Sequence, residues 1–254
     1  MKKILCLLSA TLLLFTSCSN DDNQSSNSEE SLFVKEILID YNGKTNAQKI
    51  SYDGNKIKSI TFQNGEKTTY TYSDNLITRI ANLDTNGNPV SAMEYKYVNG
   101  KIYSYLNISY NSSIPEYKNL TKYIYNQDGT VSYQVYKVNF INGAEQEKDA
   151  VSGKFYFKDG NISKEEYFSD NVLEITTSYE YDTKNNNFKN ILSYNLLLNL
   201  MPSVNNSIKA TTTPKNGVIG TVNNIYEYNS KGYPTTKMVD VVNGKPFSTV
   251  RYNY

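Results

Sequence analysis

The chain has 254 residues, a formal net charge of +1, and a composition with 24 Tyr but no Trp and no His. Without histidine it cannot form a Ser-His-Asp or Cys-His nucleophilic system or a histidine-ligated catalytic zinc site. The balanced charge gives no basic surface for nucleic acid, and no glycine-rich phosphate-binding motif is present. We therefore expect no cofactor, no nucleic-acid partner and no enzymatic activity; the chemistry left to an enzyme would be that of carboxylates, Lys or Tyr.

The N-terminus has the pattern of a secretory signal. Lys2 and Lys3 precede an apolar stretch from Ile4 to Phe15. As a helix this stretch spans about 18 Å, short of the roughly 30 Å hydrocarbon core of a bilayer. Residues 1–17 are therefore predicted to be a signal peptide rather than a membrane span.

The signal ends in Phe15-Thr16-Ser17-Cys18, which resembles the lipobox of bacterial lipoproteins, with Phe15 where Leu is usual. The resemblance implies that Cys18 is lipidated and becomes the mature N-terminus. Cys6 would leave with the signal, and several acyl chains would give stable anchoring. The alternative is an ordinary signal peptide with an incidental cysteine.

The residues after Cys18 bear on the cellular location of the protein. In many Gram-negative lipoproteins an Asp directly after the cysteine retains the protein at the inner membrane; here Ser19 implies the outer membrane. Asp21 and Asp22 are similar to a surface-export signal, and the alternative is a solvated tether on the periplasmic face. Residues 18–31 are expected to be a flexible tether, because residues 19–31 contain no large apolar side chain.

Residues 32–254 are predicted to form a single all-β domain. Pairs typical of tight hairpin turns recur along them, and the second members of the first six pairs are 10 to 13 residues apart. The pairs are Asn42-Gly43, Asp53-Gly54, Asn64-Gly65, Asp74-Asn75, Asn86-Gly87, Asn99-Gly100, Asp128-Gly129, Asn142-Gly143, Asp159-Gly160, Asp170-Asn171, Asn216-Gly217, Lys231-Gly232 and Asn243-Gly244.

An aromatic-x-aromatic motif precedes many of these turns, as in YTYSDN at 70, YKYVNG at 95, FYFKDG at 155 and YEYNSKG at 226. The repeating unit is a hairpin of about 20 to 32 residues, used about eight times. Residues i and i+2 of a strand share a face, so each motif sets two rings side by side.

These rings have two interpretations. They are an aromatic platform for a ligand, or they pack a half-buried sheet with their hydroxyls in water. So many tyrosines exceed the needs of one site, so most must be structural. The candidate binding residues are Tyr70, Tyr72, Tyr95, Tyr97, Tyr123, Tyr125, Tyr226 and Tyr228.

Some strands carry rings or aliphatic side chains on both faces, as at residues 102–110 and 131–141. This favours an antiparallel meander curled into an open or closed barrel with a filled interior. One segment departs from the pattern: residues 188–201 show helical apolar spacing and end before Pro202. We expect a short helical insert, capped by a preceding Asn, that plugs the barrel or covers the sheet; the alternative is a docking patch for a partner.

The Tyr-x-Tyr-x-x-x-Gly hairpins resemble the tyrosine-aspartate repeats of bacterial surface and toxin proteins, although Asn, Lys or Val often replaces the Asp. With the lipobox and the KNNNFKNILSYNLLLNL insert, most of the mature chain is similar to a family of uncharacterised Gram-negative lipoproteins, a domain of unknown function. That resemblance implies a porin-like β fold and an envelope address, and it supplies no catalytic residue and no metal ligand.

Carboxylates are the remaining candidates for catalysis. Glu165 and Glu166 are adjacent and point to opposite faces of a strand, while Glu145 and Glu147 share a face beside a turn where solvated charge is usual. Three functions therefore compete: a surface binding or adhesion module for an unknown glycan or protein, a structural or accessory part of an outer-membrane complex, and a carboxylate-dependent hydrolase. The first is preferred.

Overall fold

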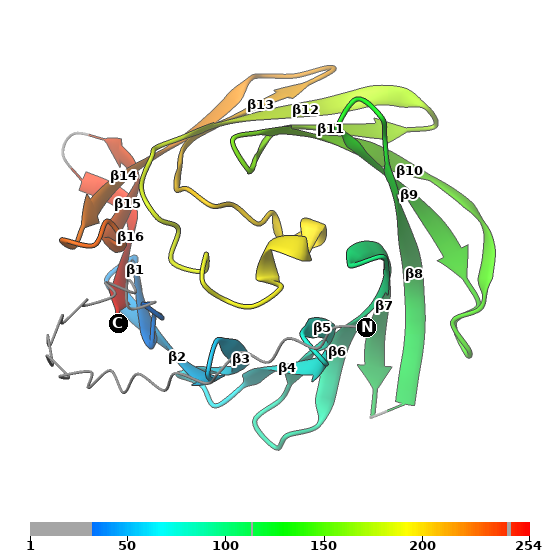
Figure 1. Ribbon diagram of the computed structural model, residues 1–254, viewed down its shortest axis with the longest axis horizontal. Helices are drawn as coiled ribbons and strands as arrows, with labels where there is room; N and C mark the ends of the chain where they lie inside the picture. The colour runs from blue at the N-terminus through cyan, green and yellow to red at the C-terminus, as the bar shows by residue number, and fades with distance from the viewer. Residues whose placement is uncertain (1–31, 113, 243–244) are drawn as a thin grey trace, which may run out of the picture. The chain divides into compact units, whose positions relative to one another are not determined.

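The computed structural model describes residues 32–112, 114–242 and 245–254, which form a closed antiparallel barrel of 16 strands (Figure 1). Each strand pairs with its neighbours in sequence, and β1 closes the barrel by pairing with β16. The predicted all-β meander of about eight hairpins is confirmed, and the barrel is closed rather than open. Closure removes the unpaired edges that an open sheet would expose.

Sixteen strands and two short turns of 3-10 helix make up the described structure. The first eight strands are β1 Glu36–Tyr41, β2 Lys44–Asp53, β3 Lys56–Phe62, β4 Lys67–Ser73, β5 Leu76–Leu83, β6 Pro89–Val98, β7 Lys101–Asn111 and β8 Ile114–Tyr125. The others are β9 Val131–Val138, β10 Glu145–Lys158, β11 Asn161–Ser169, β12 Val172–Tyr181, β13 Ser207–Pro214, β14 Gly220–Tyr228, β15 Pro234–Val242 and β16 Lys245–Asn253; the 3-10 turns are η1 Tyr194–Leu196 and η2 Leu198–Leu200.

The two ends of the barrel differ. At one end, which we call the plug end, β1 begins, β16 finishes, and the long connection 182–206 joins β12 to β13. Short turns close the other hairpins there; in one, Asn99 and Gly100 both have positive φ, 51° and 73°, as a tight hairpin turn requires. The opposite end, at which β1 joins β2, is called the far end.

The interior of the barrel is the hydrophobic core. Its main cluster combines strand residues, among them Ile77, Ile102 and Phe155, with Leu197 and Leu198 of the long connection. Figure 1 shows this connection, in yellow, running inside the ring of strands. The 182–206 connection is therefore an insert that fills the barrel at the plug end.

The insert contains two single turns of 3-10 helix where a short helix was expected near 188–201. Its apolar side chains reach different walls: Ile191 joins the cluster on β1–β3, and Leu197 joins the cluster on β5–β11. A straight helix cannot contact both walls. Ser193 and Met201 have left-handed backbone conformations and bend the chain on either side of the two 3-10 turns. The expected asparagine cap was wrong: Ser193 and Leu197 precede the two turns, and neither turn has a side-chain cap. Asn186 instead forms a local turn, in which its Oδ1 accepts a hydrogen bond from the Phe188 N–H at 2.9 Å.

Asparagines tie the insert to the barrel. Asn161 Oδ1 accepts hydrogen bonds from the N–H groups of Val204 and Asn205, at 2.9 and 3.1 Å. Asn190 donates to the Leu32 carbonyl at 2.9 Å and to the Tyr233 hydroxyl at 2.7 Å. These bonds satisfy backbone groups that an irregular segment in an apolar interior would otherwise leave unpaired.

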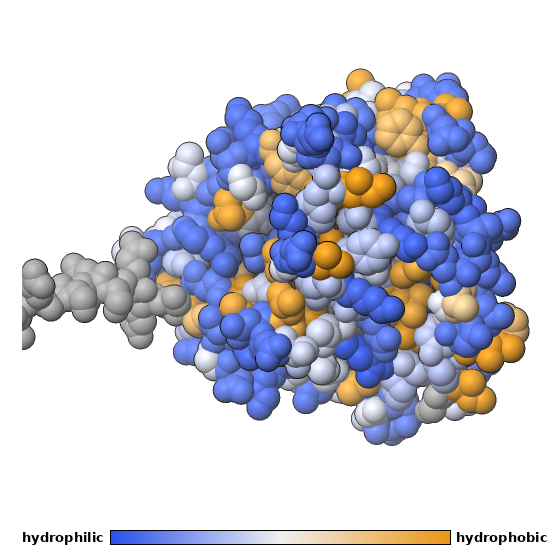
Figure 2. All heavy atoms as spheres, turned by 45° about the vertical axis from the view of Figure 1, so that its right-hand side comes forward, coloured by the Kyte–Doolittle hydropathy of each residue, from blue (hydrophilic) through white to orange (hydrophobic). Residues whose placement is uncertain are grey.

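The outer wall of the barrel carries charged pairs. Glu180 and Lys209 lie 2.9 Å apart across β12 and β13, and Asp40 and Arg251 lie 2.9 Å apart across β1 and β16. On the face in Figure 2 hydrophilic residues predominate, and apolar residues lie between them as separate patches. The wall therefore combines ion pairs with exposed apolar side chains, among them Ile124 and Ile225, which are 61% and 51% exposed.

Residues 1–31, with the predicted signal, Cys18 and the tether, lie outside the described residues. Within the described part of the chain, no helix has the length and apolar character needed to cross a bilayer.

Candidate functional site

The aromatic motifs form two layers of rings inside the barrel. In six motifs the strand register shifts just before the second ring; at Tyr97, for example, the partner changes from Ser104, opposite Lys96, to Ile102. The extra residue on the partner strand is a β-bulge, which increases local twist and curvature. The shifts precede Tyr52, Tyr72, Tyr97, Phe157, Tyr181 and Tyr228.

Hydroxyls of the second rings join neighbouring strands at the plug end. The Tyr97 hydroxyl donates to the Ile77 carbonyl at 2.7 Å, and the Tyr181 hydroxyl donates to the Ile162 carbonyl at 2.9 Å. Ile77 is fully buried and Ile162 is 1% exposed, so these carbonyls have few other donors within reach. These two rings are packed, as in the second interpretation of the motif, but their hydroxyls bond buried carbonyls and do not face water.

The first rings of the aromatic motifs belong to a ladder that lies further from the plug end than the second rings do. Five rings follow one another across β6 to β10: Tyr95, Tyr105, Tyr123, Tyr133 and Phe155. Neighbouring centroids are 6.0, 6.1, 6.4 and 5.2 Å apart, distances typical of favourable aromatic pairs. The ladder covers one wall of the lumen and faces the insert.

Gly153 determines where the Tyr133 ring lies. It faces Tyr133 in the β9–β10 register, and a Cβ atom there would lie 2.2 Å from the tyrosine Cζ and 2.4 Å from its hydroxyl oxygen. The ring therefore lies directly across the glycine, and its hydroxyl donates to Glu165 Oε1 at 3.2 Å on the next strand.

A cavity of about 350 Å³ opens between the ladder and the insert. Its volume falls within the usual range of small-molecule sites, about 300–1,000 Å³. Thr121, Val135 and Val151 line it on the side nearer the far end, so the cavity lies beyond the insert as seen from the plug end. The remaining lining residues are Tyr105, Tyr123, Tyr133, Phe155, Glu165, Leu198, Asn199 and Met201.

Two polar groups of the cavity are not fully paired. Glu165 is half-buried and hydrogen-bonds Tyr133; burial raises the pKa of its carboxyl, and this hydrogen bond opposes the shift. Asn199 donates to the Tyr95 hydroxyl at 3.1 Å, but its buried Oδ1 accepts no hydrogen bond from the described residues. Both groups are hydrogen-bond acceptors, so a ligand that donates hydrogen bonds fits this cavity.

The sequence-predicted tyrosines separate into three groups. Tyr123 lines the cavity, and Tyr95 contacts it through Asn199. Tyr70, Tyr72 and Tyr97 pack against the core.

The other three predicted tyrosines lie apart from the cavity. Tyr125 is 39% exposed, with Lys101 4.8 Å from its ring centroid. Tyr226 and Tyr228 stack at 6.0 Å, and their hydroxyls bond the Ser207 carbonyl and Asp182. The barrel thus brings two of the eight tyrosines to the cavity.

Of the other cavity residues, only Glu165 was named from the sequence, as a candidate carboxylate for catalysis. Tyr105 belongs to a strand with rings on both faces, and Phe155 belongs to an aromatic motif. The sequence pattern could therefore have indicated both residues. Tyr133 depends on Gly153 across the sheet, and Asn199 depends on the path of the insert, which no local pattern encodes.

The other three carboxylates considered from the sequence, Glu145, Glu147 and Glu166, form ion pairs. Glu166 lies on the outer wall, 2.7 Å from Lys164 Nζ, so Glu165 and Glu166 do face opposite sides. Glu145 pairs with Lys122, and Glu147 lies 2.8 Å from Lys137. Among the described residues no cluster of three or more acidic side chains has the geometry of a metal site.

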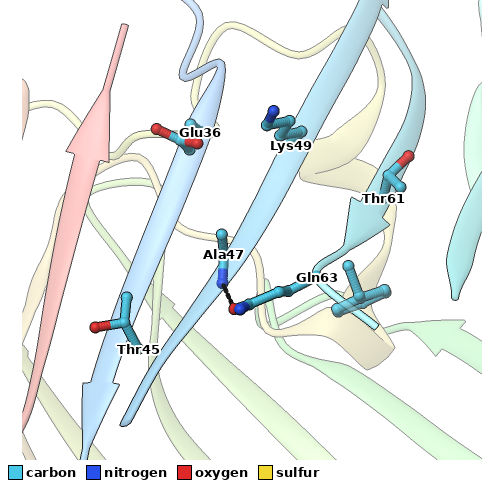
Figure 3. Close-up of a pocket in the computed structure, with 7 residues that line it drawn as sticks. Glu36, Thr45, Ala47, Lys49, Thr61 and Gln63 are labelled. Carbon is cyan, nitrogen blue, oxygen red and sulfur yellow. Dashed lines mark hydrogen bonds between the residues drawn. The ribbon is translucent and has the colours of Figure 1, made fainter. Parts of the chain in front are cut away.

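A second hollow, of about 590 Å³, lies on the outer wall over β1, β2 and β3 (Figure 3). Its polar groups already have partners: Gln63 Oε1 accepts from the Ala47 N–H at 3.1 Å, and Glu36 accepts from Asn253 at 2.8 Å. It has no ring ladder, so the lumen cavity is the stronger candidate.

No protein-family model matches this sequence, and no curated protein is similar to it in sequence. Among solved structures, a porin-like protein from Bacteroides vulgatus aligns with a TM-score of 0.59 and 16% identity, over 88% of this chain and 99% of that chain. Another porin-like protein, from Bacteroides uniformis, aligns at 0.36 and 13%, over 87% and 97%. The first likeness shows a shared porin-like barrel fold, as the family resemblance implied, and extends no further than the fold.

Proposed function

We propose that this protein is an outer-membrane lipoprotein, anchored through Cys18 and facing the cell exterior, whose barrel lumen binds a glycan. The observation that carries the binding function is the ring-lined cavity with two acceptors, Glu165 and Asn199 Oδ1. Tyrosine rings offer flat apolar faces, and the acceptors and Thr121 offer partners for hydroxyl groups. A cavity of about 350 Å³ suits one or two sugar units better than a folded protein.

The polarity of the barrel supports attachment by lipid rather than by its wall. Membrane-spanning barrels have an outward apolar band about 25 Å tall and a polar interior. This barrel carries ion pairs such as Lys209–Glu180 on its outer wall and packs rings inside.

Binding can be measured by intrinsic fluorescence. The chain has no Trp, so tyrosine emission is unobscured, and three tyrosines line the cavity. We expect a saturable change on titration with a panel of mono- and disaccharides. Val135→Phe, which fills the cavity, should abolish it, and Val98→Phe, at a 55% exposed position on β6, should not. Equal responses of the two variants would contradict a lumenal site.

The cellular location is tested separately, by protease treatment of intact native-host cells beside a Cys18→Ala control. Shaving of the wild-type protein from whole cells would support a surface-exposed lipoprotein. Protection until the outer membrane is opened would place the protein on the periplasmic face and remove the adhesion role.

An accessory role in an outer-membrane complex is the second candidate. Ile114, Phe140 and Ile141 are each about two-thirds exposed and border a hollow of about 450 Å³ at the far end. The insert is a poor contact surface, because Leu197 is fully buried. A membrane partner that co-purifies with the wild type and is lost with Phe140→Asp would favour this role.

A further inference from the structure

We infer that the lumen cavity selects a glycan that carries a free amine, as an amino sugar does. This inference rests on the proposed glycan-binding function and adds the chemical class of the ligand. Its basis is the surroundings of Glu165 compared with those of the adjacent Glu166.

Glu166 shows how a carboxylate of this sheet is satisfied on the outer wall. Lys164 Nζ lies 2.7 Å from its carboxylate and 3.7 Å from the centroid of the Tyr156 ring. The Tyr156 hydroxyl donates to Glu166 at 2.8 Å. A cation is thus held between a carboxylate and an aromatic face, an arrangement in which both attractions add.

The lumen repeats two of these three parts on the same strands. Glu165 accepts a hydrogen bond from Tyr133 at 3.2 Å, and the rings of Tyr133 and Phe155 lie 5.2 Å apart beside it. Within the described part of the chain, no Lys or Arg forms an ion pair with Glu165. A half-buried carboxylate without a cation is costly to keep ionised, and a bound ammonium group would relieve that cost.

The second acceptor points to the same chemistry. Asn199 Oδ1 is buried and accepts no hydrogen bond from the described residues, and it lines the same cavity as Glu165. An ammonium group has three donors and no acceptor, so it suits a cavity whose incompletely paired polar groups are acceptors. An acetylated amine has one donor and no charge, so it loses the attraction to both the carboxylate and the rings.

The test compares glucosamine, N-acetylglucosamine and glucose by tyrosine fluorescence at neutral pH. Glucosamine is expected to bind about tenfold more tightly than the other two, a difference of about 1.4 kcal/mol, because only its amine carries a charge that the Glu165 carboxylate attracts. Glu165→Gln should remove this preference, so that glucosamine and glucose bind with equal affinity. Glu166→Gln, on the outer wall, is the matched control and should keep the preference.

Two results would overturn the inference while leaving glycan binding in place. One is equal affinity of the wild type for glucosamine and N-acetylglucosamine, and the other is a preference that survives in Glu165→Gln. Failure of all three sugars and of the wider saccharide panel would overturn the glycan-binding function itself, and the inference with it.

Discussion

At the scale of single residues, the cavity depends on a glycine as much as on its rings. Tyr133 can reach Glu165 only because Gly153 has no side chain to hold the ring away. The position is in an extended strand, so the requirement is one of space and not of backbone conformation. Glycine in a strand often marks such a close approach.

Gly153→Ala is therefore expected to displace the Tyr133 ring and to lower the free energy of unfolding by about 1–3 kcal/mol, as overpacking usually does. Urea denaturation measures the change. Gly220→Ala is the control, because a Cβ atom there meets nothing within 4 Å. Equal stability of the two variants would show that the ring does not lie across the glycine.

Glu165 gives a pH-dependent prediction. Burial raises the pKa of its carboxyl above the ordinary 4.5, so ionisation at neutral pH opposes folding. Glu165→Gln should then raise the melting temperature at pH 7, and the gain should disappear below about pH 4, where the carboxyl is protonated in both the folded and the unfolded chain. Scanning calorimetry across this range tests it; a gain independent of pH would contradict it.

At the scale of elements, the hairpin is the unit, and the second ring of each motif links it to its neighbour. Tyr97 on β6 donates to Ile77 on β5, which belongs to the preceding hairpin. The same relation joins Tyr181 on β12 to Ile162 on β11. The links recur at the plug end, where the bulges bend the sheet, and so support its closure.

Tyr97→Phe should lower the free energy of unfolding by about 0.5–1.5 kcal/mol, because the buried Ile77 carbonyl loses its donor while the ring is kept. Tyr103→Phe, in the neighbouring strand and 43% exposed, is the control and should change stability little. Chemical denaturation of both variants gives the comparison. A loss at Tyr103 as large as that at Tyr97 would argue against the link.

Much of this architecture could be predicted from local sequence. Asn-Gly and Asp-Gly pairs mark turns because they tolerate positive φ, and ring spacing assigns the rings to one face. The insert could not be predicted in the same way. Its apolar side chains suit a helix by spacing, yet they join two different clusters on the barrel wall, so tertiary contacts decide its path. The position of Asn199, and with it the cavity, follows from that path.

At the scale of the whole molecule, the arrangement of polarity decides how the barrel meets a membrane. A wall in lipid needs apolar side chains outward, and a charged side chain at its midplane costs about 2–4 kcal/mol. This wall carries Arg251, Lys209 and Lys154 in ion pairs with neighbouring strands. These ion pairs are expected to oppose burial of the wall in lipid, and the attachment that we propose is through the N-terminus.

The chain from Ser19 onward, which lacks the signal and Cys18, is expected to remain in the aqueous phase on detergent phase separation. The lipidated wild type from its native host should enter the detergent phase, because acyl chains contribute about 0.8 kcal/mol per buried CH₂. Partition of the shortened chain into detergent would mean that the wall itself binds lipid. In that case the ion pairs would have to be broken or shielded at the lipid surface, and the lumen, with its insert, would lie across the membrane instead of beside it.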